Sequence, residues 1–165
     1  MLVLAVDIGL RVSGYCICAA DSRQVKLVKE GEIKPPVKSI LAKKLFFIHK
    51  EISRIIEDYK PKALLLERLY SHYRHPTTVS LLAQVRGVVL VLAEVYGMDS
   101  YEYSPTRARK SFLGKGSVKS YQVKKMAENV LGLKLKSKHT ADAFSLAVAF
   151  SHTLKKKVLE HDWKN

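Results

Sequence analysis

Acidic residues are scarce in this sequence. Its 165 residues include 15 Asp and Glu but 29 Lys and Arg, which gives a formal net charge of +14 at pH 7. So large an excess of positive charge predicts a polyanionic partner, either nucleic acid or an anionic membrane surface. We favour nucleic acid, because the apolar helix faces described below are expected to pack on a sheet rather than on lipid.

Cysteine and uninterrupted apolar runs are scarce as well. The two cysteines, Cys16 and Cys18, have the spacing that puts both thiols on one face of a strand. No metal-binding or redox partner residues accompany them, so reduced core thiols in a cytoplasmic protein are expected. Charges interrupt the apolar stretches, which predicts no membrane span. Segment 1–7 lacks a basic region and a cleavage site, which favours a strand over a signal peptide.

Linkers, internal repeats and low-complexity tracts are absent from the sequence too. The five prolines lie at junctions between expected elements, and 47% of the residues are hydrophobic, enough for one compact core. We therefore predict a single domain over 1–165, with roughly the last ten residues as a basic tail after the solvated helix end at 155–157.

Apolar periodicity predicts the order of the elements. Strands are expected at 2–7, 14–20, 24–33, 63–67 and 99–103, and helices at 40–59, 79–96, 120–131 and 138–154. The order predicts an α/β fold, in which a mixed five-stranded sheet is flanked by helices.

Four side chains form a candidate metal site. Asp7 and Glu67 each end an apolar strand, where ligands of open α/β sheets collect. His139 and Asp142 are three residues apart at the start of the last helix, so they share one face. Such donors suit Mg²⁺ or Mn²⁺. Each acid also has a structural interpretation: a turn residue for Asp7, an ion pair of Glu67 with its neighbour, and a first-turn helix acid for Asp142.

Two segments have the composition of nucleic-acid contacts. Segment 68–76 alternates basic residues, such as Arg74, with aromatic residues, such as Tyr70. Such a segment can bind phosphates and stack on nucleobases, or its side chains can simply pack locally. In the second segment Lys115 lies between two glycines, and Lys119 precedes a helix N-terminus. That arrangement suits a phosphate or equally a solvated turn.

Five ordered motifs resemble the RuvC-type Holliday junction resolvases, crossover junction endodeoxyribonucleases of the ribonuclease H-like superfamily. They lie at 6–15 (VDIGLRVSGY), 66–70 (LERLY), 84–88 (QVRGV), 114–116 (GKG) and 139–143 (HTADA). The resemblance runs from Val3 to about His152. Ile8 stands where the family has proline, and His139 where some members have Asp.

The resemblance implies a ribonuclease H-like sheet and a homodimer that nicks two opposed strands of a four-way DNA junction in recombination and repair. The implied products carry a 5′-phosphate and a 3′-hydroxyl. The implied metal ligands are Asp7, Glu67, His139 and Asp142, holding two Mg²⁺ ions for which Mn²⁺ substitutes. The implied DNA contacts are Tyr70 and Arg109, the latter at a family lysine, and we add Arg74, Arg86, Lys115 and Lys119 as candidates. A second family lysine corresponds to Ser120, one place from Lys119.

Several residues fit more than one role. His139 is either a ligand or a proton shuttle, and a branch-migration helicase complex is a candidate partner. The helix at 79–96 is a candidate dimer interface through Val85, Val89, Leu92 and Tyr96, although these residues equally suit a sheet contact. Two other functions fit the residues: a ribonuclease H-like enzyme acting on RNA or another branched structure, and a catalytically silent junction-binding protein.

Overall fold

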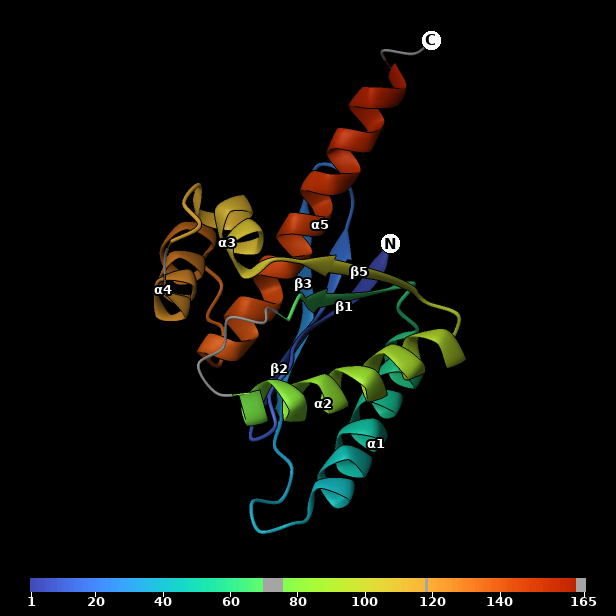
Figure 1. Cartoon of the computed structure of the whole chain (residues 1–165). Helices are drawn as coiled ribbons and strands as arrows, with labels where there is room; N and C mark the ends of the chain where they lie inside the picture. Colours follow the sequence, from blue (N-terminus) through green and yellow to red (C-terminus); the bar gives the residue numbers. More distant parts are fainter. Residues whose placement is uncertain (70–75, 118, 163–165) are drawn as a thin grey trace.

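A mixed five-stranded sheet forms the centre of the computed structural model, which describes residues 1–69, 76–117 and 119–162 (Figure 1). Its strands are β1 (Leu2–Asp7), β2 (Ser13–Ala20), β3 (Val25–Ile33), β4 (Ala63–Glu67) and β5 (Asp99–Tyr103). They lie in the order β3-β2-β1-β4-β5; β1, β2 and β3 form an antiparallel meander, whereas β4 pairs in parallel with both β1 and β5. The predicted mixed sheet is therefore confirmed.

Helices cover both faces of the sheet. They are α1 (Leu41–Tyr59), α2 (Pro76–Val95), α3 (Pro105–Leu113), α4 (Ser120–Leu131) and α5 (Lys138–Asp162). Helices α1 and α2 pack on one face, and α3, α4 and α5 on the other; α5 extends beyond the sheet toward the C-terminus (Figure 1).

Strand alternation decides which side chains meet which helices. In β1, Val3 and Ala5 join the core under α5, whereas Leu4 and Val6 join the core under α1 and α2. Strand β4 alternates in the same way. Both central strands are thus buried on both faces, which explains their continuous apolar sequences.

Helix α3 was not among the predicted elements. The side chain of Ser104 accepts a hydrogen bond from the backbone N–H of Arg107 at 3.1 Å, Pro105 opens the helix, and Gly114 ends it with φ 72°. The Ser-Pro start and the glycine end were a readable signal. The apolar periodicity of this helix is weak, because Ala108 is its one fully buried residue. As a result Arg109 lies on a helix, not in a loop.

Helix α2 corrects the expectation that charge interrupts every apolar run. By length and composition alone it is long and apolar enough to cross a membrane, a test that core helices of soluble proteins also pass. One face is buried in the core through Val85, Val89 and Leu92, whereas Val91 and Val95 on another face are 61% and 70% exposed. Helix α2 is therefore apolar on two faces, one buried and one exposed. Val85 and Val89, which were candidates for a dimer interface, belong to the core.

The two cysteines are free and buried, as predicted. The Cys16 thiol donates to the carbonyl oxygen of Thr140 at 3.3 Å, and burial raises the pKa of Cys18 to about 12. Both thiols are therefore protonated packing groups between the sheet and α5.

Candidate active site at the ends of two parallel strands

Asp7 and Glu67 lie side by side at one edge of the sheet. The parallel register pairs Val6 with Leu66, so the next residue on each strand is an acid. Both acids continue the alternation of Val3, Ala5 and Leu65, whose side chains face α5. Register and alternation together therefore aim two carboxylates at the start of α5.

The first turn of α5 brings His139 and Asp142 to the same place. Ser137 and Thr140 cap the helix reciprocally: the backbone N–H of Ser137 donates to Thr140 Oγ1 at 3.0 Å, and that of Thr140 to Ser137 Oγ at 3.3 Å. A side chain at Gly14 would prevent this approach, because an added Cβ would lie 2.3 Å from the carbonyl carbon of His139. Glycine on β2 is thus what lets the helix start against the sheet.

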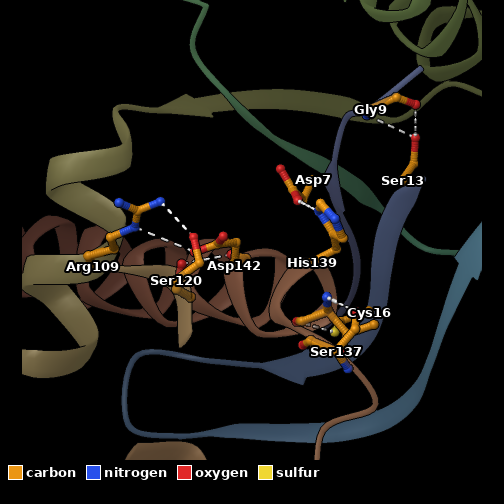
Figure 2. A network of polar contacts seen from close by, with 11 residues as sticks. Asp7, Gly9, Ser13, Cys16, Arg109, Ser120, Ser137, His139 and Asp142 are labelled. Carbon is orange, nitrogen blue, oxygen red and sulfur yellow. Dashed lines mark hydrogen bonds and ion pairs between the residues drawn. The ribbon is translucent and has the colours of Figure 1, made fainter. Parts of the chain in front are cut away.

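Two pairs of side chains hold the site (Figure 2). His139 Nδ1 lies 2.7 Å from Asp7 Oδ2, and Arg109 Nε lies 3.4 Å from Asp142 Oδ1. Arg109 also donates from Nη2 to Ser120 Oγ at 3.2 Å, so it connects α3, α4 and α5. The side chains of Asp7 and Asp142 are only 19% and 10% exposed.

Three partly buried carboxylates repel one another here. Burial, followed by the charges of Asp7 and Asp142, raises the pKa of Glu67 to about 7. Burial also raises the pKa of Asp7, against the opposing effects of His139 and Arg109. The hydrogen bond to Asp7 raises the pKa of His139. The cluster therefore holds more negative charge than its own cations neutralise, in a protein that is otherwise strongly basic.

This donor set fits a divalent cation. Oxygen ligands suit Mg²⁺, and Asp142 Oδ1 is buried without a hydrogen-bond partner among the described residues. Within the described part of the chain, however, no three His, Cys, Asp or Glu side chains are gathered into a ready metal cage. Asp7 and Asp142 point instead to His139 and Arg109. The two aspartates of the candidate site are thus engaged in internal pairs.

Comparison with known proteins identifies the family. The family model described as "Crossover junction endodeoxyribonuclease RuvC" matches residues 3–152. The chain belongs to the RuvC family. Curated members of that name from Syntrophomonas wolfei and Chlamydia muridarum are each 32% identical to it; the alignments cover 92% of this chain and 88% and 91% of the relatives.

Solved structures show the same fold. The T. thermophilus RuvC in complex with a Holliday junction substrate superposes with a TM-score of 0.85 at 22% identity, over 95% of this chain and 96% of that one. The yeast mitochondrial Holliday junction resolvase Ydc2 gives 0.66 at 16% identity, over 96% and 80%. The ribonuclease H-like fold expected from the motifs is thereby confirmed for this RuvC family member.

The predicted DNA contacts fall in different parts of this family fold. Tyr70 and Arg74 lie outside the described residues. Lys115 is exposed in the turn between α3 and α4, and Lys119 is the exposed N-cap residue of α4. Both lysines lie between α3 and α4, two of the three helices that Arg109 connects, so three of the predicted cations share one region.

Arg86 has a partner inside the protein. Its side chain is 15% exposed and forms an ion pair with Glu102 of β5, and Arg68 Nε lies 3.9 Å from the same carboxylate. Glu102 thus ties α2 to the residue that follows Glu67. Its role was not predicted, because the sequence gives no sign of which cation an acid on an edge strand will meet. The assignment of Arg86 to DNA binding stays a prediction, which this pairing disfavours.

A second contribution that sequence reasoning missed comes from Ser13. Its hydroxyl donates to the carbonyl oxygen of Gly9 at 2.8 Å and accepts from the Gly9 N–H at 3.0 Å, which closes the loop after Asp7 (Figure 2). A cavity of about 570 Å³ opens beside this loop, lined by Gly9–Val12, Thr78, Leu81, Leu82 and His139. The loop therefore forms one wall of a hollow that reaches the candidate site.

Proposed function

We propose that this protein is a metal-dependent endonuclease that resolves four-way DNA junctions by nicking two opposed strands. The observation that carries the proposal is the meeting of Asp7, Glu67 and Asp142 at the ends of two parallel strands. Membership of the RuvC family and the charge of +14 support it. The same proposal places the protein in the cytoplasm, in recombination and repair, with a branch-migration helicase complex as a candidate partner.

Asp7, Glu67, His139 and Asp142 are the residues that would hold the cation, with two Mg²⁺ ions as the proposed complement and Mn²⁺ as a substitute. Bound there, divalent cations supply the Lewis acidity for phosphodiester hydrolysis to 5′-phosphate and 3′-hydroxyl ends. Carboxylate oxygens match the preference of these cations. Neutralisation of the cluster by a cation would also favour the charged form of Glu67, whose pKa is about 7 without one.

His139 orients Asp7 through Nδ1. Because that nitrogen is engaged, Nε2 is the atom that can bind the cation or carry a proton. Asp142 stands within reach from the first turn of the same helix, so one rigid element sets the positions of two of the four groups.

DNA binding is assigned to the basic side chains around α3 and α4. Arg109, Lys115 and Lys119 are proposed to meet phosphates, and Tyr70 and Arg74 are proposed to contact the strands near the junction centre. Each phosphate contact makes the slope of log affinity against log salt concentration more negative by about 0.9 on duplex DNA, so junction affinity should fall steeply with salt.

A homodimer is the proposed assembly, since paired nicks require two sites. The exposed face of α2, with Val91 61% and Val95 70% exposed, is the candidate interface. Contiguous exposed apolar patches often mark protein–protein contact sites.

The first experiment is cleavage of a synthetic four-way junction labelled on each strand in turn, with Mg²⁺ or Mn²⁺. We expect symmetric paired nicks that Asp7→Asn abolishes while junction binding survives, because the substitution removes a metal ligand and no phosphate contact. Cleavage by Asp7→Asn at the wild-type rate would refute the site. Tight binding without nicks would point to a silent junction binder, and preferred cleavage of an RNA duplex or RNA/DNA hybrid to a different substrate.

A further inference from the structure

Arg109 approaches the carboxylate cluster from α3. Its Nε lies 3.4 Å from Asp142 Oδ1 and its Nη2 donates to Ser120 Oγ at 3.2 Å (Figure 2). The side chain of Arg109 is 23% exposed and that of Asp142 is 10% exposed. Water screens a pair at this depth less than it screens a surface ion pair, so the contact is a substantial part of the electrostatics of the site.

The positive charge of Arg109 reaches beyond Asp142. It opposes the rise in the pKa of both Asp7 and Glu67. His139 also acts on Asp7, through a direct hydrogen bond. One guanidinium therefore partly compensates three carboxylates while no metal ion is bound.

A divalent cation bound at Asp142 Oδ1 would compete with Arg109 for that oxygen. A cation that uses Asp142 Oδ1 would come within a few ångströms of a guanidinium that is already in an ion pair with that atom. Two positive charges at one carboxylate repel each other, so the Arg109–Asp142 pair weakens when the cation binds. We propose that Arg109 is an internal counter-ion that holds Asp142 in the metal-free protein, and that cation binding releases its guanidinium to a phosphate of the DNA.

The surroundings of Arg109 suit this transfer. Its second contact, Ser120, directly follows Lys119 at the start of α4, and Lys115 is exposed in the turn between the two helices. A released guanidinium would therefore lie beside two exposed lysines. Arginine suits both partners because its planar donors match a carboxylate and a phosphate equally well. This inference rests on the proposed function, and it makes Arg109 a positioning residue in the metal-free state.

Cation affinity without DNA is the first test. Mn²⁺ binding to the metal-free protein is measured by calorimetry for wild type, Arg109→Gln, Arg109→Lys and the control Lys110→Gln. The control removes an exposed charge from the next residue of α3. We expect Arg109→Gln to bind Mn²⁺ about tenfold more tightly, the factor that corresponds to one charge-assisted contact of about 1.4 kcal/mol. Arg109→Lys should fall between wild type and Arg109→Gln, and the control should stay near wild type.

The direction of the change decides the test. If Arg109 instead held Asp142 in the side-chain conformation that binds the cation, Arg109→Gln would bind Mn²⁺ more weakly than wild type. That result would overturn the proposal. An equal gain in Lys110→Gln would show a general charge effect and would overturn it too. If Arg109→Gln fails to fold, Arg109→Lys against wild type carries the same comparison.

Salt dependence of junction binding tests the release. Ca²⁺ serves as the probe because it binds oxygen ligands with looser geometry than Mg²⁺. We expect the log–log salt slope of wild type to be steeper by about 0.9 in Ca²⁺ than in chelator, which is the increment for one phosphate contact. Arg109→Gln should give the same slope in both, and Lys110→Gln should keep the increment.

The two proposals fail differently. A wild-type protein that binds neither Mn²⁺ nor the junction would refute the proposed function. A protein that binds and cleaves the junction, but in which Arg109→Gln neither tightens Mn²⁺ binding nor removes the slope increment, would refute only the role given to Arg109.

Discussion

Removing the charge of Glu67 should stabilise the metal-free protein at high pH. Its pKa of about 7 in the folded chain compares with an ordinary value of 4.5. Between these values the folded protein retains a proton that the unfolded chain has released. The stabilisation is thus fully present below pH 4.5 and is lost as the pH rises through about 7.

The difference between the two pKa values corresponds to up to about 3 kcal/mol. Glu67→Gln resembles the neutral form at every pH, so it should not lose this stability. We expect the free energies of unfolding of Glu67→Gln and wild type to be similar near pH 4.5 and to differ by up to about 3 kcal/mol near pH 8, in favour of the variant.

Urea unfolding in the presence of a chelator measures this difference at both pH values. Glu94→Gln, an exposed acid on α2, is the matched control and should follow wild type. Added Mg²⁺ should then stabilise wild type at pH 8 more than Glu67→Gln. Parallel pH profiles for wild type and Glu67→Gln would refute the argument that burial and the neighbouring carboxylates hold a proton on Glu67.

Gly14→Ala, with Gly87→Ala as its control, tests the packing around the site, and Val91→Glu tests the proposed dimer. Gly14→Ala should lower the free energy of unfolding by about 1–3 kcal/mol and reduce cleavage, because the added carbon meets the backbone of His139. Gly87→Ala, whose added carbon meets nothing within 4 Å, should be at least as stable as wild type in the same urea titration. Val91→Glu should shift light-scattering mass from dimer to monomer without loss of helical circular dichroism; an unchanged dimer would exclude this face of α2.

Most of the fold could be predicted because the pattern of apolar residues indicates both layers of the core. The continuous apolar runs of β1 and β4 indicate strands buried on two faces, and the amphipathic pattern of α1 indicates a helix on one side. Helix α3 shows the pattern less clearly, because Ala108 is its one fully buried residue and Phe112 and Leu113 are only partly buried against the core. Its capping residues were the only local evidence for it.

The candidate site was partly predictable for a related reason. Asp7 and Glu67 each end an apolar strand, and His139 and Asp142 stand three residues apart on one helix. Spacing puts the second pair on one face, whereas the first pair meets because β1 and β4 pair in parallel. The pairing of His139 with Asp7 and of Arg109 with Asp142 depends on how α3 and α5 pack, which no local pattern states. The same holds for Arg86, whose partner Glu102 belongs to an edge strand on the far side of β4.

The alternation that aims Asp7 and Glu67 at α5 limits how this chain can change over evolution. Deleting or inserting one residue within β1 or β4 would turn the terminal carboxylate to the face covered by α1 and α2, even if every apolar position stayed apolar. Helix α3 is under a related constraint, because a one-residue insertion or deletion before Arg109 would turn its side chain by about 100° around the helix axis, away from Asp142. We therefore expect lineages to keep β1 and β4 at fixed length.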